Sequence, residues 1–99
     1  MKVISGYWHI KPVFENEFIA LCKWIAPYSK AEEGYVSYLF TKDEMNENHF
    51  LFFEEWKNQA AIDFHVEQWY FKEFMQKANL LLVSKPIIKI YDVEKMTML

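Results

Sequence analysis

Residues 50–74 decide the fold of this chain, and their sequence is FLFFEEWKNQAAIDFHVEQWYFKEF. The segment from His49 to Trp56 is the most apolar part of the chain and predicts a strand. Its large apolar side chains fall on both faces, with Phe50, Phe52 and Trp56 on one and Leu51 and Phe53 on the other. Asn58 can then cap a short helix over Gln59–Phe64. A longer amphipathic helix is predicted next, with the apolar set Trp69, Phe71, Phe74, Met75, Ala78, Leu81 and Leu82.

The N-terminal third of the chain predicts a strand followed by a helix. Side chains alternate from Lys2 to Ile10, with Val3, Ser5, Tyr7 and His9 on one face and Ile4, Gly6, Trp8 and Ile10 on the other. Apolar residues then recur every three or four positions, at Phe14, Phe18, Leu21, Cys22, Ile25 and Tyr28. Pro27 lies inside this helical pattern and lacks an amide hydrogen, so we expect a kink or an early stop near Ala26.

The remaining segments complete an α+β pattern. Tyr35 to Thr41 predicts a strand, the polar residues 42–48 predict a hairpin loop, and Ile87 to Val93 predicts a last strand. The order strand, helix, strand, strand, helix pair, strand is that of a ferredoxin-like βαββαβ fold with a four-stranded antiparallel sheet. Residues 1–99 fit a single domain. We expect the tail, residues 94–99, to be loose or to cross to another subunit.

One face of the predicted sheet is expected to meet a second copy of the chain. The helices of this fold cover a single face, and the other face should be polar if it met water. Here the strands carry large apolar residues on both faces. The sequence therefore predicts a homodimer through the open sheet face, with an interface on the order of 1,000 Å².

The composition excludes several classes of protein. The chain is 53% hydrophobic and 19% aromatic, which is more aromatic surface than a small core needs and leaves rings for an interface or a ligand pocket. A net charge of −3 without a basic cluster argues against nucleic acid as a partner. The single cysteine, Cys22, excludes an internal disulfide and fits a reducing compartment, so the expected location is cytoplasmic. The apolar runs are too short for a signal peptide or a membrane span.

The candidate chemistry depends on three residues in the quoted stretch. Phosphate-loop, nucleophile-elbow and zinc-site motifs are missing, and the three histidines lie far apart in sequence, so no metal or cofactor site is expected. Glu54 lies among aromatic residues, Trp56 follows on the same face, and His65 comes just beyond the short helix. Together they could line one pocket, with His65 as a base or a hydrogen-bonding group. The plainer alternatives are a lysine partner for Glu54 and a core or capping role for His65, bound to a backbone carbonyl.

The quoted stretch resembles the signature of the antibiotic biosynthesis monooxygenase (ABM) superfamily. The shared features are an apolar strand that ends in Glu54-x-Trp56, a short helix, and a histidine, His65, that opens the long helix. Two weaker marks agree: IKPVFENEFIAL at residues 10–21 resembles the strand-to-helix junction, and EEGYVSYLF at residues 32–40 resembles the Glu-x-Gly strand entry. One position departs, because many members have a second histidine where this chain has Tyr70.

This resemblance implies a dimeric α/β barrel whose pocket, between sheet and helices, oxidises quinol-like or polycyclic aromatic molecules with O2 and without metal, flavin or haem. The residues that match the family's motif, and are expected to be catalytic, are Glu54, Trp56 and His65. The side chains expected to contact the substrate are Tyr7, Phe52, Trp69 and Tyr70.

Other branches of the superfamily give other expectations. A haem-degrading branch uses an asparagine, a tryptophan and a haem-binding histidine at positions that align with Tyr7, His65 and Met75, which disfavours haem degradation. An isomerase branch that acts on a small phosphorylated signalling metabolite fits the spacing from Glu54 to His65 equally well. A non-catalytic module for small-molecule binding or stress response is the third alternative, because fold alone does not choose between functions.

Overall fold

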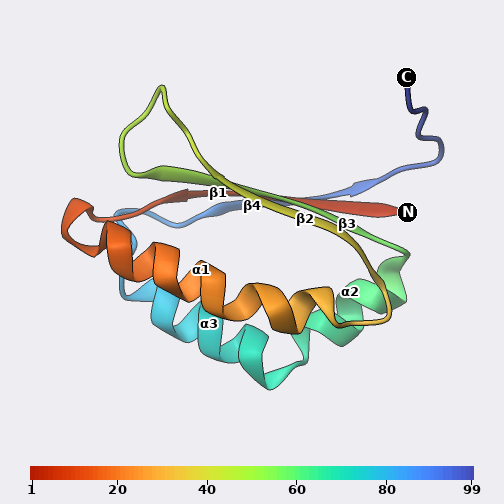
Figure 1. Ribbon diagram of the computed structural model, residues 1–99, viewed down its shortest axis with the longest axis horizontal. Helices are drawn as coiled ribbons and strands as arrows, with labels where there is room; N and C mark the ends of the chain where they lie inside the picture. The colour runs from red at the N-terminus through yellow and green to blue at the C-terminus, as the bar shows by residue number, and fades with distance from the viewer.

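The computed structural model describes residues 1–99 as a four-stranded antiparallel sheet with all helices on one face (Figure 1). The strands are β1 (Lys2–His9), β2 (Tyr35–Lys42), β3 (His49–Trp56) and β4 (Ile87–Asp92). The helices are η1 (Pro12–Phe14), α1 (Glu15–Lys30), α2 (Gln59–Val66) and α3 (Trp69–Asn79). The strand order is β2-β3-β1-β4. These features confirm the predicted α+β, ferredoxin-like fold.

Strand register decides which side chains share the helix-covered face. Gly6 on β1 pairs with Phe52 on β3, and Ile4 pairs with Glu54, so both pairs point toward the helices. A Cβ at Gly6 would lie 2.8 Å from Nε1 of Trp8, so glycine gives the indole room to lie over β1. The buried core between sheet and helices consists of Trp8, Ile10, Phe18, Cys22, Ile25, Phe50, Phe52, Tyr70, Phe74, Ala78 and Leu81.

Two helix boundaries differ from the sequence prediction. The early stop expected near Ala26 is wrong, because α1 continues through Pro27 to Lys30. Proline removes one backbone hydrogen bond, but Ile25 and Ser29 are buried on either side and packing holds the last turn. The prediction that Leu81 and Leu82 belong to the long helix is also wrong.

After α3 ends at Asn79, the chain turns back along the end of β1. The amide of Lys11 donates to the carbonyl of Leu81 at 2.8 Å, and the amide of Val83 donates to the carbonyl of His9 at 2.9 Å. These bonds join the segment after α3 to the end of β1 and satisfy backbone groups that lie beyond the helix.

The second sheet face carries apolar side chains that no helix covers. Leu39 is 57% exposed, Phe53 41%, Ile87 56% and Tyr91 46%. The loop between β2 and β3 and the C-terminal tail both extend beyond this face (Figure 1). None of the helices combines the length and the hydropathy that a membrane-spanning helix needs.

Candidate functional site

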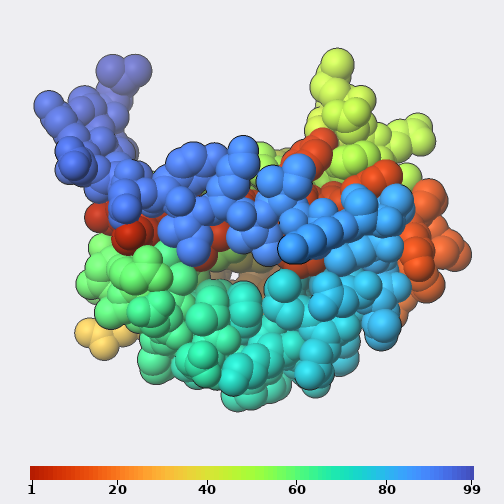
Figure 2. Space-filling view, turned by 180° about the vertical axis from the view of Figure 1, so that it is seen from behind, coloured from red at the N-terminus to blue at the C-terminus, as the bar shows by residue number.

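A cavity of about 130 Å³ lies between the sheet and the three α-helices. Three of the predicted site residues, Phe52, Glu54 and His65, line it. Figure 2 shows the opening between β4 and the helices α2 and α3. Ile88 and Ile90 of β4, which are about half exposed, line this side. Most of the lining is apolar, so the few polar groups in the wall act in a dry environment.

His65 is held against a buried carboxylate. It lies in the last turn of α2, which begins after the Asn58 cap, and it shares the inner face of the helix with Ile62. Nδ1 lies 2.6 Å from Oε2 of Glu32, and the imidazole ring lies 4.5 Å from the ring of Trp56. The alternative of a histidine bound to a backbone carbonyl is therefore wrong. The position differs slightly from the prediction, because His65 closes the short helix and does not open the long one.

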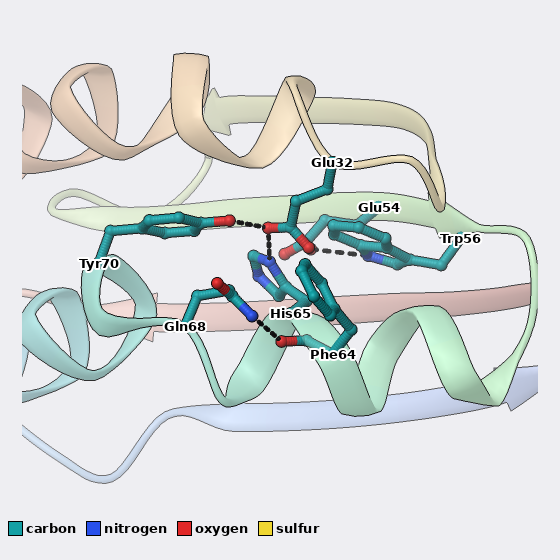
Figure 3. A network of polar contacts seen from close by, with 7 residues as sticks. All are labelled: Glu32, Glu54, Trp56, Phe64, His65, Gln68 and Tyr70. Atoms are coloured by element: carbon teal, nitrogen blue, oxygen red, sulfur yellow. Dashed lines mark hydrogen bonds and ion pairs between the residues drawn. The ribbon is translucent and has the colours of Figure 1, made fainter.

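Glu32 is the candidate site residue that the sequence prediction missed. Its side chain is 4% exposed, and Oε2 accepts a second hydrogen bond, at 2.5 Å, from the hydroxyl of Tyr70 (Figure 3). The other oxygen, Oε1, is buried without a partner. A Cβ at Gly34 would lie 2.2 Å from Cβ of Ala61, so only glycine lets the α1–β2 loop approach α2 closely enough for these contacts. The Glu-x-Gly mark at residues 32–34 was the signal for this residue.

Because a carboxylate oxygen only accepts, Nδ1 of His65 carries the proton in this pair. Nε2 is then left as an acceptor on a residue that lines the cavity. The arrangement of carboxylate, imidazole and cavity is that of an oriented general base.

Glu54 and Trp56 lie together on the same face of the sheet, as predicted. Nε1 of Trp56 donates to Oε1 of Glu54 at 3.0 Å, so the partner is an indole and not the lysine of the plainer alternative. The pKa of Glu54 is raised to about 7, chiefly by burial and also by the charge of Glu32. The hydrogen bond from Trp56 offsets part of this rise. Glu54 can therefore gain or lose a proton near neutral pH.

Two more polar side chains reach the cavity. Tyr38 pairs with Glu54 across β2 and β3, and burial raises the pKa of its hydroxyl well above the ordinary value. Ser29 of α1 is buried, and its Oγ has no hydrogen-bond partner. Ser29 lies within the apolar stripe of a helix, and no sequence signal separated it from a core residue. Burial also raises the pKa of the Cys22 thiol well above its ordinary value.

Three of the predicted substrate contacts lie outside this cavity. Tyr7 is on the opposite sheet face, where its hydroxyl donates to Oδ2 of Asp43 at 2.5 Å. Trp69 is 58% exposed at the start of α3 and packs on the outer surface against Trp24 and Tyr28. Tyr70 lines a second, outer pocket. The pattern alone did not fix the register between β1 and β3 or the rotation of α3, so it did not separate these residues from Phe52.

The outer groove, as we call this second pocket, has a volume of about 750 Å³. It lies between the end of α1 and the start of α2, and its lining includes Tyr28, Glu32, Phe64 and Tyr70. Glu32 and Tyr70 face this groove whereas His65 faces the inner cavity. The Tyr70–Glu32–His65 network therefore connects the two pockets (Figure 3). No group of three histidine, cysteine, aspartate or glutamate side chains is arranged to hold a metal ion.

Comparisons with known proteins agree with this architecture. The chain is 44% identical over 91 residues to an uncharacterized protein of Synechocystis, covering 92% of this chain and 62% of that relative, so it spans less than two thirds of the relative's length. It is 36% identical over 87 residues to the Bacillus subtilis protein named "Putative monooxygenase YcnE", covering 88% of this chain and 90% of that one.

Solved structures are similar over nearly the whole fold. A conserved protein from Methanosarcina mazei has a TM-score of 0.88 at 28% identity, covering 91% of this chain and 89% of that one. A crystal structure of an antibiotic biosynthesis monooxygenase has a TM-score of 0.89 at 22% identity, covering 96% of this chain and 100% of that one. The family model described as antibiotic biosynthesis monooxygenase matches residues 1–77. With its fold, its sequence relatives and this match in agreement, the chain belongs to the antibiotic biosynthesis monooxygenase (ABM) family.

Proposed function

We propose that this protein is a monooxygenase that uses O2 to oxidise a small phenol or hydroquinone bound in the inner cavity, without an added cofactor. The observation that carries the proposal is His65: Glu32 holds its Nδ1 at 2.6 Å, and the residue lines a mostly apolar cavity. Family membership supports the reaction class.

The cavity volume narrows the substrate class. An apolar cavity of about 150 Å³ in another protein holds a benzene molecule, so 130 Å³ accommodates about one aromatic ring. The polycyclic substrates that the family resemblance implied are too large for this space. A single-ring phenol is the class that fits the volume of this cavity.

In the proposed reaction, Nε2 of His65 removes the phenolic proton, and Glu32 stabilises the imidazolium that forms. The resulting anion transfers one electron to O2, and the superoxide and phenoxyl radicals combine to form a carbon–oxygen bond. Loss of water from the hydroperoxide leaves a quinone, so that one O2 is consumed and one H2O is released for each substrate. Exclusion of water protects the radical pair from side reactions.

The neighbouring polar groups have positioning roles in this proposal. The Trp56 indole holds the Glu54 carboxyl in place, and Tyr38 lies next to that carboxyl in the register of β2 and β3. Ser29 Oγ, which has no partner in the protein, is available to a substrate oxygen.

The test is oxygen uptake by the purified protein with single-ring hydroquinones and with two-ring analogues. We expect uptake with the single-ring compounds, a hydroxyquinone that carries one new oxygen atom as the product, and a loss of about 10²- to 10⁴-fold in His65→Ala. His49→Ala is the matched control, because His49 lies on the opposite sheet face. Uptake at the buffer rate, or equal rates in the two variants, would contradict the proposal.

A second candidate is isomerisation of a small oxygenated metabolite. It is supported by the presence of two groups that can exchange protons, Glu54 and His65, in the wall of one cavity. Products of unchanged mass that form without oxygen consumption would favour this reaction.

The assembly proposed for this protein is a homodimer through the open sheet face. Its uncovered apolar residues, such as Leu39 and Phe53, and the tail that projects beyond the face with Met96 and Met98 exposed, support a second copy as the occupant (Figure 1). Sedimentation should give a dimer at micromolar concentration. A stable monomer that keeps these side chains in water would contradict it.

A further inference from the structure

The outer groove has the size of a ligand site and contains a polar group that the proposed reaction leaves unsatisfied. Its volume of about 750 Å³ falls within the roughly 300–1,000 Å³ that is usual for small-molecule pockets. The groove wall includes Glu32, whose side chain is 4% exposed. Oε2 accepts from both His65 and Tyr70, whereas the buried Oε1 accepts from no donor. Buried carboxylate oxygens are almost always satisfied, so this oxygen points to a donor that the protein itself does not supply.

The charges around the groove select the kind of donor. Glu32 and Glu33 line it with a single lysine, Lys57, so its walls carry more negative than positive charge. A positively charged donor forms stronger hydrogen bonds with a carboxylate than a neutral donor does. This favours an ammonium group over a hydroxyl group.

Aromatic rings form the apolar part of the groove. The rings of Tyr28 and Tyr70 are stacked, with centroids 5.0 Å apart and an angle of 22° between their planes. Phe64 contributes from α2 and is 57% exposed. Ring faces attract cations and also pack against flat apolar molecules, so these walls suit an aromatic body that carries an ammonium group.

We propose that the outer groove binds a primary aromatic amine of about two rings, with its ammonium group donating to Oε1 of Glu32. This site is separate from the inner cavity, which has room for about one ring. The proposal does not depend on the oxidation reaction. Because Glu32 also holds His65, occupation of the groove is expected to change the NMR signals of the His65 ring.

The test is a calorimetric titration of the full chain with 1-naphthylmethylamine and with its neutral isostere, 1-naphthylmethanol. We expect the amine to bind at least about tenfold more tightly, because only the amine brings a charge to Glu32. Glu32→Gln should bring the two affinities within about twofold of each other. Equal affinities for amine and alcohol in the natural chain would overturn the proposal.

A second pair of variants locates the binding without altering Glu32. Ala60 is exposed and lines the groove, so Ala60→Trp should fill it and weaken amine binding at least about tenfold. Ala20→Trp adds the same ring at an exposed position of α1 outside the groove and should bind as the natural chain does. If Ala60→Trp binds the amine unchanged, the proposed site is wrong. Oxygen uptake with a single-ring hydroquinone tests the oxidation reaction, whereas the calorimetric titration tests amine binding in the outer groove. Either proposal can therefore fail while the other holds.

Discussion

The molecule contains two clusters built from a tyrosine, a histidine and a carboxylate, one buried and one more exposed. In the buried cluster, the Tyr70 hydroxyl and His65 both bind Glu32. In the exposed cluster, on the open sheet face, the Tyr7 hydroxyl binds Asp43 at the same distance of 2.5 Å, but His49 binds the backbone carbonyl of Glu47.

Burial from solvent changes the pKa values of the carboxyl groups in and beside the two clusters. Hydrogen bonds from Tyr7, Asn46 and the Met45 amide lower the pKa of Asp43 to about 2. Next to the buried cluster, the carboxyl of Glu54 has its pKa raised to about 7, chiefly by burial. The same groups therefore form a surface turn in one place and a candidate catalytic site in the other.

The largest stability difference is expected between Glu32→Ala and Asp43→Ala. Loss of Glu32 leaves the buried His65 and Tyr70 without their acceptor, so the free energy of unfolding should fall by about 3 kcal/mol. Asp43 is only partly buried, and its hydrogen-bond partners can turn to water, so Asp43→Ala should cost much less. Urea unfolding of both variants measures this. Equal losses would show that burial does not distinguish the two clusters.

Glu54, whose pKa is raised, and Asp43, whose pKa is lowered, should make stability depend on pH with opposite signs. The pKa of Glu54 rises on folding from 4.5 to about 7, so the folded state holds the proton more tightly. The free energy of unfolding should therefore fall by up to about 3 kcal/mol as pH rises from 4.5 to 7. The pKa of Asp43 falls from 3.8 to about 2, so its contribution is present above pH 4 and is lost as pH falls toward 2.

Unfolding measured from pH 2 to pH 8 separates these effects. Glu54→Gln should flatten the curve between pH 4.5 and 7, and Asp43→Asn should flatten it below pH 4. If the stability curve of Glu54→Gln ran parallel to that of the natural chain, the pH dependence would not come from Glu54.

The smallest effect is expected from removal of a single hydroxyl group. Tyr70→Phe keeps the ring stacked on Tyr28 but removes a donor to Glu32, and should reduce stability by about 1–2 kcal/mol. Tyr7→Phe removes the corresponding bond to Asp43, where water can replace it, and should have a smaller effect. Thermal unfolding of the two variants gives the comparison, and a larger loss for Tyr7→Phe would reverse it.

The sequence predicted the elements and half of the site because both depend on local patterns. Alternation located the first strand, and apolar and β-branched composition located the other three. Parity on one strand placed Glu54 and Trp56 together. His65 reached the same cavity because a cap at Asn58 fixes the start of α2.

The rest of the site depends on contacts between residues that are far apart in the sequence. Glu32 meets His65 only because Gly34 lets a loop pack against Ala61, a contact between residues far apart in sequence. The error over Tyr7 has a similar origin. Its parity was correct within β1, but only the register with β3 shows that its partner is Leu51 and not a cavity residue such as Phe52.

The central claim is that Glu32 orients His65 as a base, and the most direct measurement is the tautomer of that ring. Long-range ¹H–¹⁵N NMR spectra of the natural chain, recorded at a pH where the ring is neutral, distinguish the two nitrogens. We expect a proton on Nδ1 and a bare Nε2 for His65, and loss of this preference in Glu32→Gln. A proton on Nε2 in the natural chain would contradict it, because the cavity would then meet a donor and not a base.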